Sequence, residues 1–181
     1  MTVARLACLV LVAGILSLPG VAWSETPAKV YALVAERLSV MEDVAAWKHA
    51  NGKPVEDLER EAVVLEAAVK NAQAEGIGEE GAEAFFQAMI DGAKDIQNCA
   101  IARWEAGDAE PPSDPPNLTE EIRPRLIILG RKILGSIRRS LEEGSGLEDR
   151  AAFDEAMALD CLSPASRDGI YTAMTRLRFK G

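Results

Sequence analysis

Apolar residues recur every three or four positions along most of the chain, which is the spacing of amphipathic α-helices. Caps, prolines and glycines divide this pattern into segments. A Thr-Pro pair begins a predicted helix over residues 26–51, which ends at an Asn-Gly pair. A second helix is predicted from Pro54 to about Gly76, and a third over residues 79–106.

The second half of the chain has the same helical period but is more interrupted. Residues 107–116 (GDAEPPSDPP) are too rich in proline for a helix and predict an extended surface connection. A fourth helix over residues 119–143, with a kink at Pro124, is followed by shorter ones over 148–159 and 163–179. Because no alternating β-branched runs occur, the pattern predicts one all-α domain of about six helices.

The first 24 residues have a different pattern. Arg5 precedes a continuous apolar stretch over residues 6–18, and a Pro-Gly pair and the small residues Ala22 and Ser24 follow it. This layout is typical of a secretory signal peptide, whereas a membrane anchor would need a longer apolar stretch. We expect cleavage after Ser24, a mature chain of residues 25–181 in the periplasm or outside the cell, and no membrane association after signal removal.

The net charge of the mature chain limits the classes of partner that it can bind. Removing the signal leaves 19 basic and 29 acidic residues, and this acidic excess argues against nucleic acid or an anionic membrane. One histidine, His49, and no Cys-x-x-Cys pair argue against a zinc site. Cys99 and Cys161 are the cysteines that remain, and the sequence leaves open whether they form a disulfide or two buried thiols.

Two cations interrupt the apolar stripe of the first helix. The stripe consists of Val30, Val34, Arg37, Met41, Val44 and Lys48. Burying a cation is costly unless an anion meets it, and about 16 Å of helix separates these two, so both could reach one point between them. They predict a small anionic ligand bound between helices. The alternative is that each reaches solvent or pairs with an acid on another helix.

Further candidates follow in order along the chain. Asp57, Arg60 and Glu61 share one turn of the second helix, where an exposed surface network is the alternative interpretation. Gln97 takes a core-facing position of the third helix and could equally be a hydrogen-bonded core amide. Arg123, beside Pro124, carries no signal when taken alone.

As an ordered set, Arg37, Lys48, Asp57, Arg60, Glu61 and Gln97 resemble the active-site signature of the all-helical chorismate mutases. The residues at 35–38, 44–48, 54–57, 94–97, Trp104, 117–118 and 122–124 are similar to the exported, periplasmic subclass, and the match spans about 30–134. The resemblance implies a type II-like helical bundle with a catalytic core over about 28–135 and C-terminal helices over 147–180. It also implies a homodimer, no cofactor and chorismate as substrate.

The resemblance also implies a role for each residue. Members convert chorismate to prephenate, a step of aromatic amino acid biosynthesis, by an intramolecular Claisen rearrangement. Lys48, Gln97 and Arg60 would be the catalytic residues, with the first two donating to the ether oxygen. Substrate binding would use Arg37, Lys48, Asp57, Arg60, Glu61, Gln97 and Arg123, where the arginines hold carboxylates, and Glu61 and Asp57 the ring hydroxyl. Because Arg123 replaces an arginine that cytoplasmic relatives take from a partner, the site would lie within one chain.

Two positions depart from the family pattern. Ala93 stands where relatives commonly have a small polar residue that helps hold a carboxylate, and Val64 where some exported relatives have an amide. Either change is expected to weaken substrate binding without removing a group that the rearrangement needs. Two other functions stay open at this point: a non-catalytic exported helical protein that binds a partner, and a pocket that sequesters or senses an aromatic-pathway carboxylate.

Overall fold

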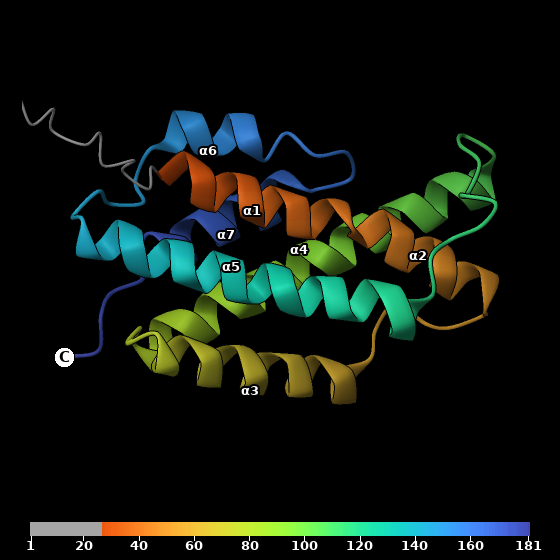
Figure 1. Cartoon of the computed structure of the whole chain (residues 1–181). Coiled ribbons are helices and arrows are strands. Elements are labelled where there is room, and N and C mark those ends of the chain that lie inside the picture. The colour runs from red at the N-terminus through yellow and green to blue at the C-terminus, as the bar shows by residue number, and fades with distance from the viewer. Residues whose placement is uncertain (1–26) are drawn as a thin grey trace, which may run out of the picture.

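The computed structural model describes residues 27–181, and the predicted signal peptide lies outside this range. Figure 1 shows an elongated bundle of helices. The α-helices are α1 (Pro27–Ser39), α2 (Met41–Ala50), α3 (Leu58–Ala74), α4 (Glu79–Ala106), α5 (Arg123–Glu142), α6 (Arg150–Ala156) and α7 (Pro164–Met174), and a π-helical turn, η1, covers Leu118–Ile122. The predicted all-α class is confirmed. None of the helices in residues 27–181 is both long and apolar enough to cross a bilayer.

The predicted helix over 26–51 was wrong in one respect, because the chain forms two helices there. Ser39 Oγ donates to the carbonyl oxygen of Glu36, and the helix is interrupted at the buried Val40. A hydroxyl that bonds the preceding turn competes with the regular ladder of backbone bonds. α2 nevertheless continues along nearly the same line as α1 (Figure 1). Arg37, Met41, Val44 and Lys48 of the predicted stripe still face one space between the helices.

Other predicted boundaries also change. α3 begins at Leu58 rather than Pro54, because Asp57 caps it by accepting from the Arg60 N–H at 3.1 Å. Pro124 produces no kink: it lies in the first turn of α5, where its missing N–H needs no partner, and η1 precedes it. The last two predicted helices are shorter in the structure, since α6 ends at Ala156 and α7 at Met174.

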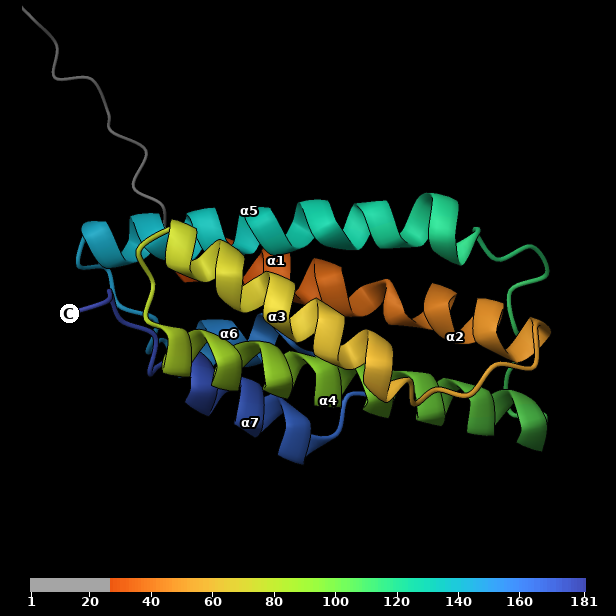
Figure 2. The same ribbon diagram turned by 90° about the horizontal axis from the view of Figure 1, so that it is seen from below.

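Helix α4 is the centre of the bundle. It packs against α2, α3 and α7, while α1 packs against α5 and α6. Seen from below in Figure 2, α7 lies on the side of α4 that faces away from α5. After α7 the chain extends and pairs with residues 76–78 through the Gly78 N–H to the Arg178 carbonyl. The two C-terminal helices therefore cover the outer faces of α1 and α4.

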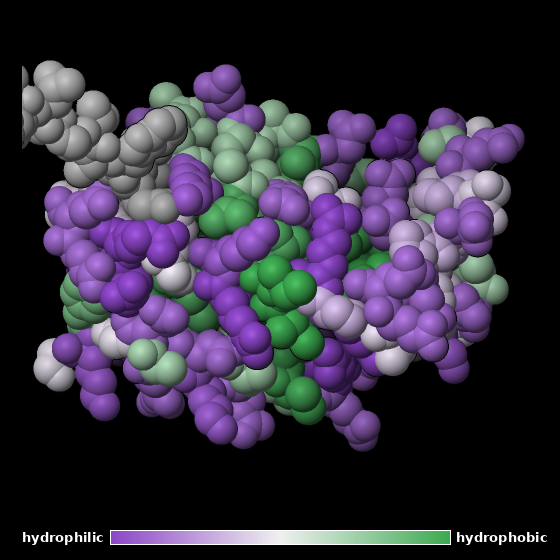
Figure 3. Space-filling view, viewed as in Figure 1, coloured by the Kyte–Doolittle hydropathy of each residue, from purple (hydrophilic) through white to green (hydrophobic). Residues whose placement is uncertain are grey.

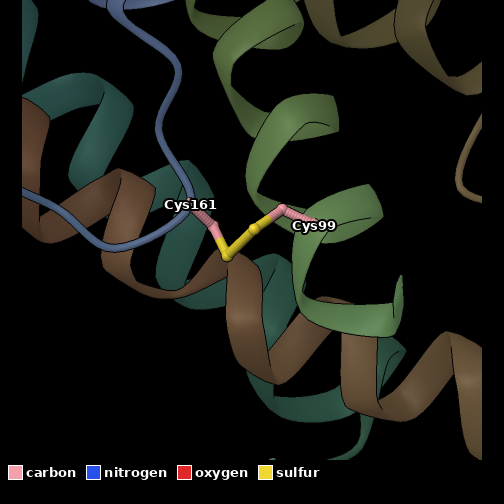
Figure 4. The surroundings of a disulfide bond; sticks show 2 residues. All are labelled: Cys99 and Cys161. Carbon is pink, nitrogen blue, oxygen red and sulfur yellow. A yellow bond between two sulfur atoms is a disulfide. The ribbon is translucent and has the colours of Figure 1, made fainter. Parts of the chain in front are cut away.

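A disulfide holds this C-terminal part to the bundle. Cys99 of α4 and Cys161 are bonded, with their Cα atoms 5.5 Å apart (Figure 4). Nearby, Asp95 of α4 accepts hydrogen bonds from the hydroxyls of Ser163 and Ser166 at 2.5 Å each. Of the two alternatives that the sequence left open, the structure has the disulfide.

Candidate active site

A cavity of about 580 Å³ opens between α1–α2, α3, α4 and α5. Helices α3 and α5 both line this cavity and run in the same direction (Figure 1), closer together at their C-terminal ends than at their N-terminal ends (Figure 2). Every site residue predicted from the sequence lines this cavity: Arg37, Lys48, Asp57, Arg60, Glu61, Gln97 and Arg123. Residues separated by up to 86 positions in the chain therefore face one space.

The mouth of the cavity is apolar. Val63 of α3 and Ile127 of α5 line it and are each about half exposed, at 53% and 49%. In Figure 3, hydrophobic side chains gather between α5 and α3, within a surface that is otherwise mostly polar. Large apolar residues that remain exposed as a group mark a binding surface. The cavity thus combines an apolar entrance with charged groups in its interior.

Arg37 is a half-buried cation of the cavity. Its Nη1 donates to the carbonyl oxygen of Leu126 at 2.7 Å, and within residues 27–181 it forms no ion pair with a carboxylate. Burial without an anionic partner lowers the pKa of Arg37 to about 10. The alternative in which Arg37 pairs with an acid on another helix is therefore wrong for the described part of the chain.

Lys48 is held by the loop that leads into α3. Its Nζ donates to the carbonyl oxygen of Val55 at 2.6 Å. Desolvation lowers the pKa of Lys48, and the nearby charges of Asp57 and Glu61 oppose that shift in part. The ammonium has two further protons to donate toward the cavity. Lys48 is thus a cation held in place by a neutral carbonyl group, and it can still bind an anionic ligand.

Two arginines face the cavity from opposite helices. Arg60 lies in the first turn of α3, and its guanidinium has no hydrogen bond or ion pair with any of residues 27–181. Arg123 begins α5, and its Nη1 reaches the Thr119 hydroxyl at 3.5 Å, a weak contact. A guanidinium has five N–H donors that suit a carboxylate, so both side chains can hold an anion that enters between them.

Both acids of the site accept hydrogen bonds, and neither pairs with the Arg60 side chain, so within residues 27–181 the three residues do not form the alternative exposed network. The Asp57 carboxylate caps α3. Glu61 accepts at Oε1 from the Asp57 N–H at 3.2 Å and at Oε2 from Lys94 Nζ at 3.0 Å. Each carboxylate oxygen can accept a further bond, so Glu61 can still receive a hydroxyl group from a ligand.

Gln97 is a buried amide with an unmet hydrogen bond. The residue is 5% exposed, and its Nε2 donates to the carbonyl oxygen of Ala93 at 3.0 Å. Its Oε1 has no partner in residues 27–181. Buried polar atoms are normally paired, and an unpaired one costs stability. The alternative of a fully hydrogen-bonded core glutamine is therefore wrong.

Sequence reasoning missed part of the cavity. The sequence indicates Lys94 only as part of the 94–97 segment, yet Lys94 lines the cavity and binds Glu61. The apolar lining from η1 and α5, such as Leu118 and Leu134, was also missed, since a helical stripe does not show which stripes meet. Ala93 and Val64, the two departures from the family pattern, both line the cavity. No group of His, Cys, Asp or Glu within residues 27–181 is arranged to hold a metal ion.

Comparison with known proteins identifies the family. The sequence model of the chorismate mutase type II family matches residues 27–98. The secreted chorismate mutase of Yersinia pestis is 31% identical over 150 residues, which cover 82% of this chain and 80% of the relative. The chain belongs to the chorismate mutase type II family. The family predicted from the sequence is thus confirmed.

Further chorismate mutases agree in sequence and in structure. The monofunctional chorismate mutase of Enterobacter agglomerans is 31% identical over 146 residues, covering 79% of this chain and 78% of the relative. The crystal structure of the Yersinia pestis secreted chorismate mutase superposes with a TM-score of 0.77 at 30% identity, covering 84% of this chain and 98% of that one. The similarity therefore extends beyond residue 98 and includes most of the helical bundle.

Proposed function

We propose that the protein is a chorismate mutase that converts chorismate to prephenate in the cavity between α1–α2, α3, α4 and α5. The observation that carries the proposal is a set of cavity cations without carboxylate partners. Arg37, Arg60 and Arg123 face one space and form no ion pair within residues 27–181. A dicarboxylate substrate would supply the missing anions, because charge-assisted bonds from guanidinium groups to carboxylates are among the strongest available.

The rearrangement requires positioning and electrostatic stabilisation rather than acid–base chemistry. One bond of the ether breaks while a carbon–carbon bond forms within the same molecule, so no covalent enzyme intermediate is needed. Holding both carboxylates fixes the compact conformation in which the reacting carbons approach each other. In this proposal Arg37, Arg60 and Arg123 perform that task.

Negative charge develops on the ether oxygen as its bond breaks. In our proposal Lys48 and Gln97 donate to that oxygen, and Lys48 also contacts a carboxylate. Lys48 Nζ is held by the Val55 carbonyl, so this donor is in place before the substrate arrives. Gln97 Nε2 donates to the Ala93 carbonyl and contacts Met41 Sδ at 3.9 Å, and in our proposal the ether oxygen replaces the weak sulfur contact. Donors that need no reorganisation stabilise the transition state most effectively. Glu61, with Asp57, would accept the ring hydroxyl.

The site would be complete within one chain, because all seven proposed residues line a single cavity. The homodimer implied by the family resemblance is a separate proposal, and the molar mass of the mature protein in solution tests it. We also propose export through the segment 1–24, with cleavage after Ser24 and a periplasmic or secreted product. The names of the secreted relatives in Yersinia pestis and Mycolicibacterium smegmatis support this location. Mass spectrometry of the N-terminus of the exported protein tests the cleavage position.

The decisive test of the function is product formation. Purified residues 25–181, shown to be folded by circular dichroism, are incubated with chorismate, and prephenate is quantified against chorismate consumed. We expect prephenate to appear in a one-to-one ratio with the chorismate lost. Tight chorismate binding without turnover would instead support a sequestering or sensing role, and neither binding nor turnover would support a non-catalytic protein.

A further inference from the structure

Lys94 contacts two acids, Glu61 inside the candidate site and Asp91 outside it. It lies on α4, one turn before Gln97, and lines the cavity. Its Nζ lies 3.0 Å from Glu61 Oε2 and 3.5 Å from Asp91 Oδ1. Both members of the Lys94–Glu61 pair are largely shielded, with side chains 25% and 19% exposed. Such a pair is screened less by solvent than an ordinary surface ion pair.

Lys94 and the Asp57 backbone hold Glu61 from two sides. One oxygen of the Glu61 carboxylate accepts from the Asp57 N–H, and the other accepts from Lys94. A carboxylate held at both oxygens has a fixed plane. The Asp57 contact alone, at 3.2 Å, would leave the carboxylate free to turn about that bond.

Without Lys94, the competing partner for Glu61 would be Lys48. Glu61 and Lys48 both line the cavity, and the charge of Glu61 opposes the lowering of the Lys48 pKa, although the two form no ion pair within residues 27–181. A Glu61 carboxylate released on one side would turn toward this cation, since a half-buried charge is costly to leave unpaired. The Lys48 ammonium would then be bound to a protein acid rather than directed to a ligand.

We propose that Lys94 is a positioning residue, which binds Glu61 so that Glu61 accepts the substrate hydroxyl and Lys48 remains available to the ether oxygen. This inference rests on the proposed function. It assigns to Lys94 no contact with the reacting atoms. Asp91, which lies farther from Lys94 Nζ, does not line the cavity and supports Lys94 only from outside.

Steady-state kinetics of a double-mutant cycle test the proposal. The variants are Lys94→Met, Glu61→Gln, their combination, and Lys94→Arg as the conservative replacement. Asp91→Asn is the matched control, because it removes the outer contact of Lys94 and leaves the Glu61 bond intact. Methionine keeps the apolar stem of the lysine, and Lys94→Gln is a second truncation should Lys94→Met not fold.

We expect Lys94→Met to lower kcat/KM by about 10- to 100-fold, mainly through kcat, because a donor that acts in the transition state is diverted. Lys94→Arg should recover most of this loss, and Asp91→Asn should stay within about twofold of the unmodified protein. In the Glu61→Gln background, Lys94→Met should cause little further loss, because a neutral amide no longer competes for Lys48.

Each other outcome overturns the inference. If the unmodified protein is active and Lys94→Met or Lys94→Gln keeps its kcat, the inference fails while the proposed function stands. If Lys94→Met lowers kcat equally in both backgrounds, Lys94 acts independently of Glu61, and the inference also fails. If the folded, unmodified protein forms no prephenate, the proposed function fails and the inference fails with it.

Discussion

The arginines of the cavity and the arginines of the C-terminal helices have opposite surroundings. Arg150 of α6 lies 2.7 Å from Asp154 and 2.6 Å from Asp168, and it also stacks over the ring of Tyr171. In the cavity, Arg37 and Arg60 form no carboxylate pair within residues 27–181. An acidic chain can easily give an exposed arginine its partners. Leaving the shielded arginines without partners is costly, and it indicates that a ligand supplies the anions.

The disulfide lies outside the cavity and ties the C-terminal helices to the bundle, and removing it should have the largest effect on stability. Because Cys99 and Cys161 lie 62 positions apart in the sequence, the Cys99→Ala/Cys161→Ala variant should lose about 4 kcal/mol of the free energy of unfolding. Chemical denaturation of both proteins measures the loss. The rate of chorismate conversion should change by less than about twofold at temperatures where the variant stays folded. A large loss of rate in the folded variant would mean that the C-terminal helices take part in the site.

Removal of Lys48 should have the opposite effect, a large loss of rate with little loss of stability. We expect Lys48→Ala to lower kcat by at least about 100-fold, because it removes a donor to the developing charge. The free energy of unfolding should stay close to that of the unmodified protein, since a desolvated cation is removed along with its bond to Val55. Kinetics and denaturation of the same sample measure both quantities. A large loss of stability with an unchanged rate would mean that Lys48 stabilises the fold and has no role in catalysis.

Introducing a hydroxyl group at residue 93 should strengthen substrate binding in the cavity. Ala93 lines the cavity, and the family pattern commonly has a small polar residue there. We expect Ala93→Ser to lower KM by about tenfold, which corresponds to one hydrogen bond to a charged group. The substitution Ala88→Ser on the same helix, outside the cavity, is a suitable control. An unchanged KM in Ala93→Ser would show that the carboxylate is already fully bound.

The pH dependence of the rate should report the desolvated lysine. Lys48 donates to the substrate only when protonated, and desolvation lowers its pKa below the usual value near 10.5. Activity should therefore fall as the pH rises through this lowered pKa, on the alkaline side. Gln97 stays neutral throughout, so we expect activity to persist at neutral and mildly alkaline pH. The profile of kcat/KM against pH, which reports groups of the free enzyme, measures this, and Lys48→Arg should move the alkaline loss to higher pH. A profile identical in Lys48→Arg would assign the titration to another group.

Much of the fold could be predicted from the sequence because it follows from a helical period, whereas the set of site residues was predicted from the resemblance to a family. The stripe that places Arg37 and Lys48 on one face needs only the spacing of residues along one helix. Contacts between distant segments could not be predicted in this way. The Lys94–Glu61 bond joins residues 33 positions apart, and it depends on how α3 packs on α4. The break at Val40 and the turn η1 likewise depend on local hydrogen bonds that compete with a regular helix.

The contrast between paired and unpaired arginines can be tested directly by comparing kcat/KM for chorismate in Arg60→Ala and Arg150→Ala, measured beside the unmodified mature protein. Both variants remove one guanidinium, and both should stay folded. We predict that Arg60→Ala loses at least about 100-fold in kcat/KM, while Arg150→Ala stays within about twofold. Equal rates in the two variants, or no chorismate conversion by the folded, unmodified protein, would contradict the assignment of the cavity as the active site.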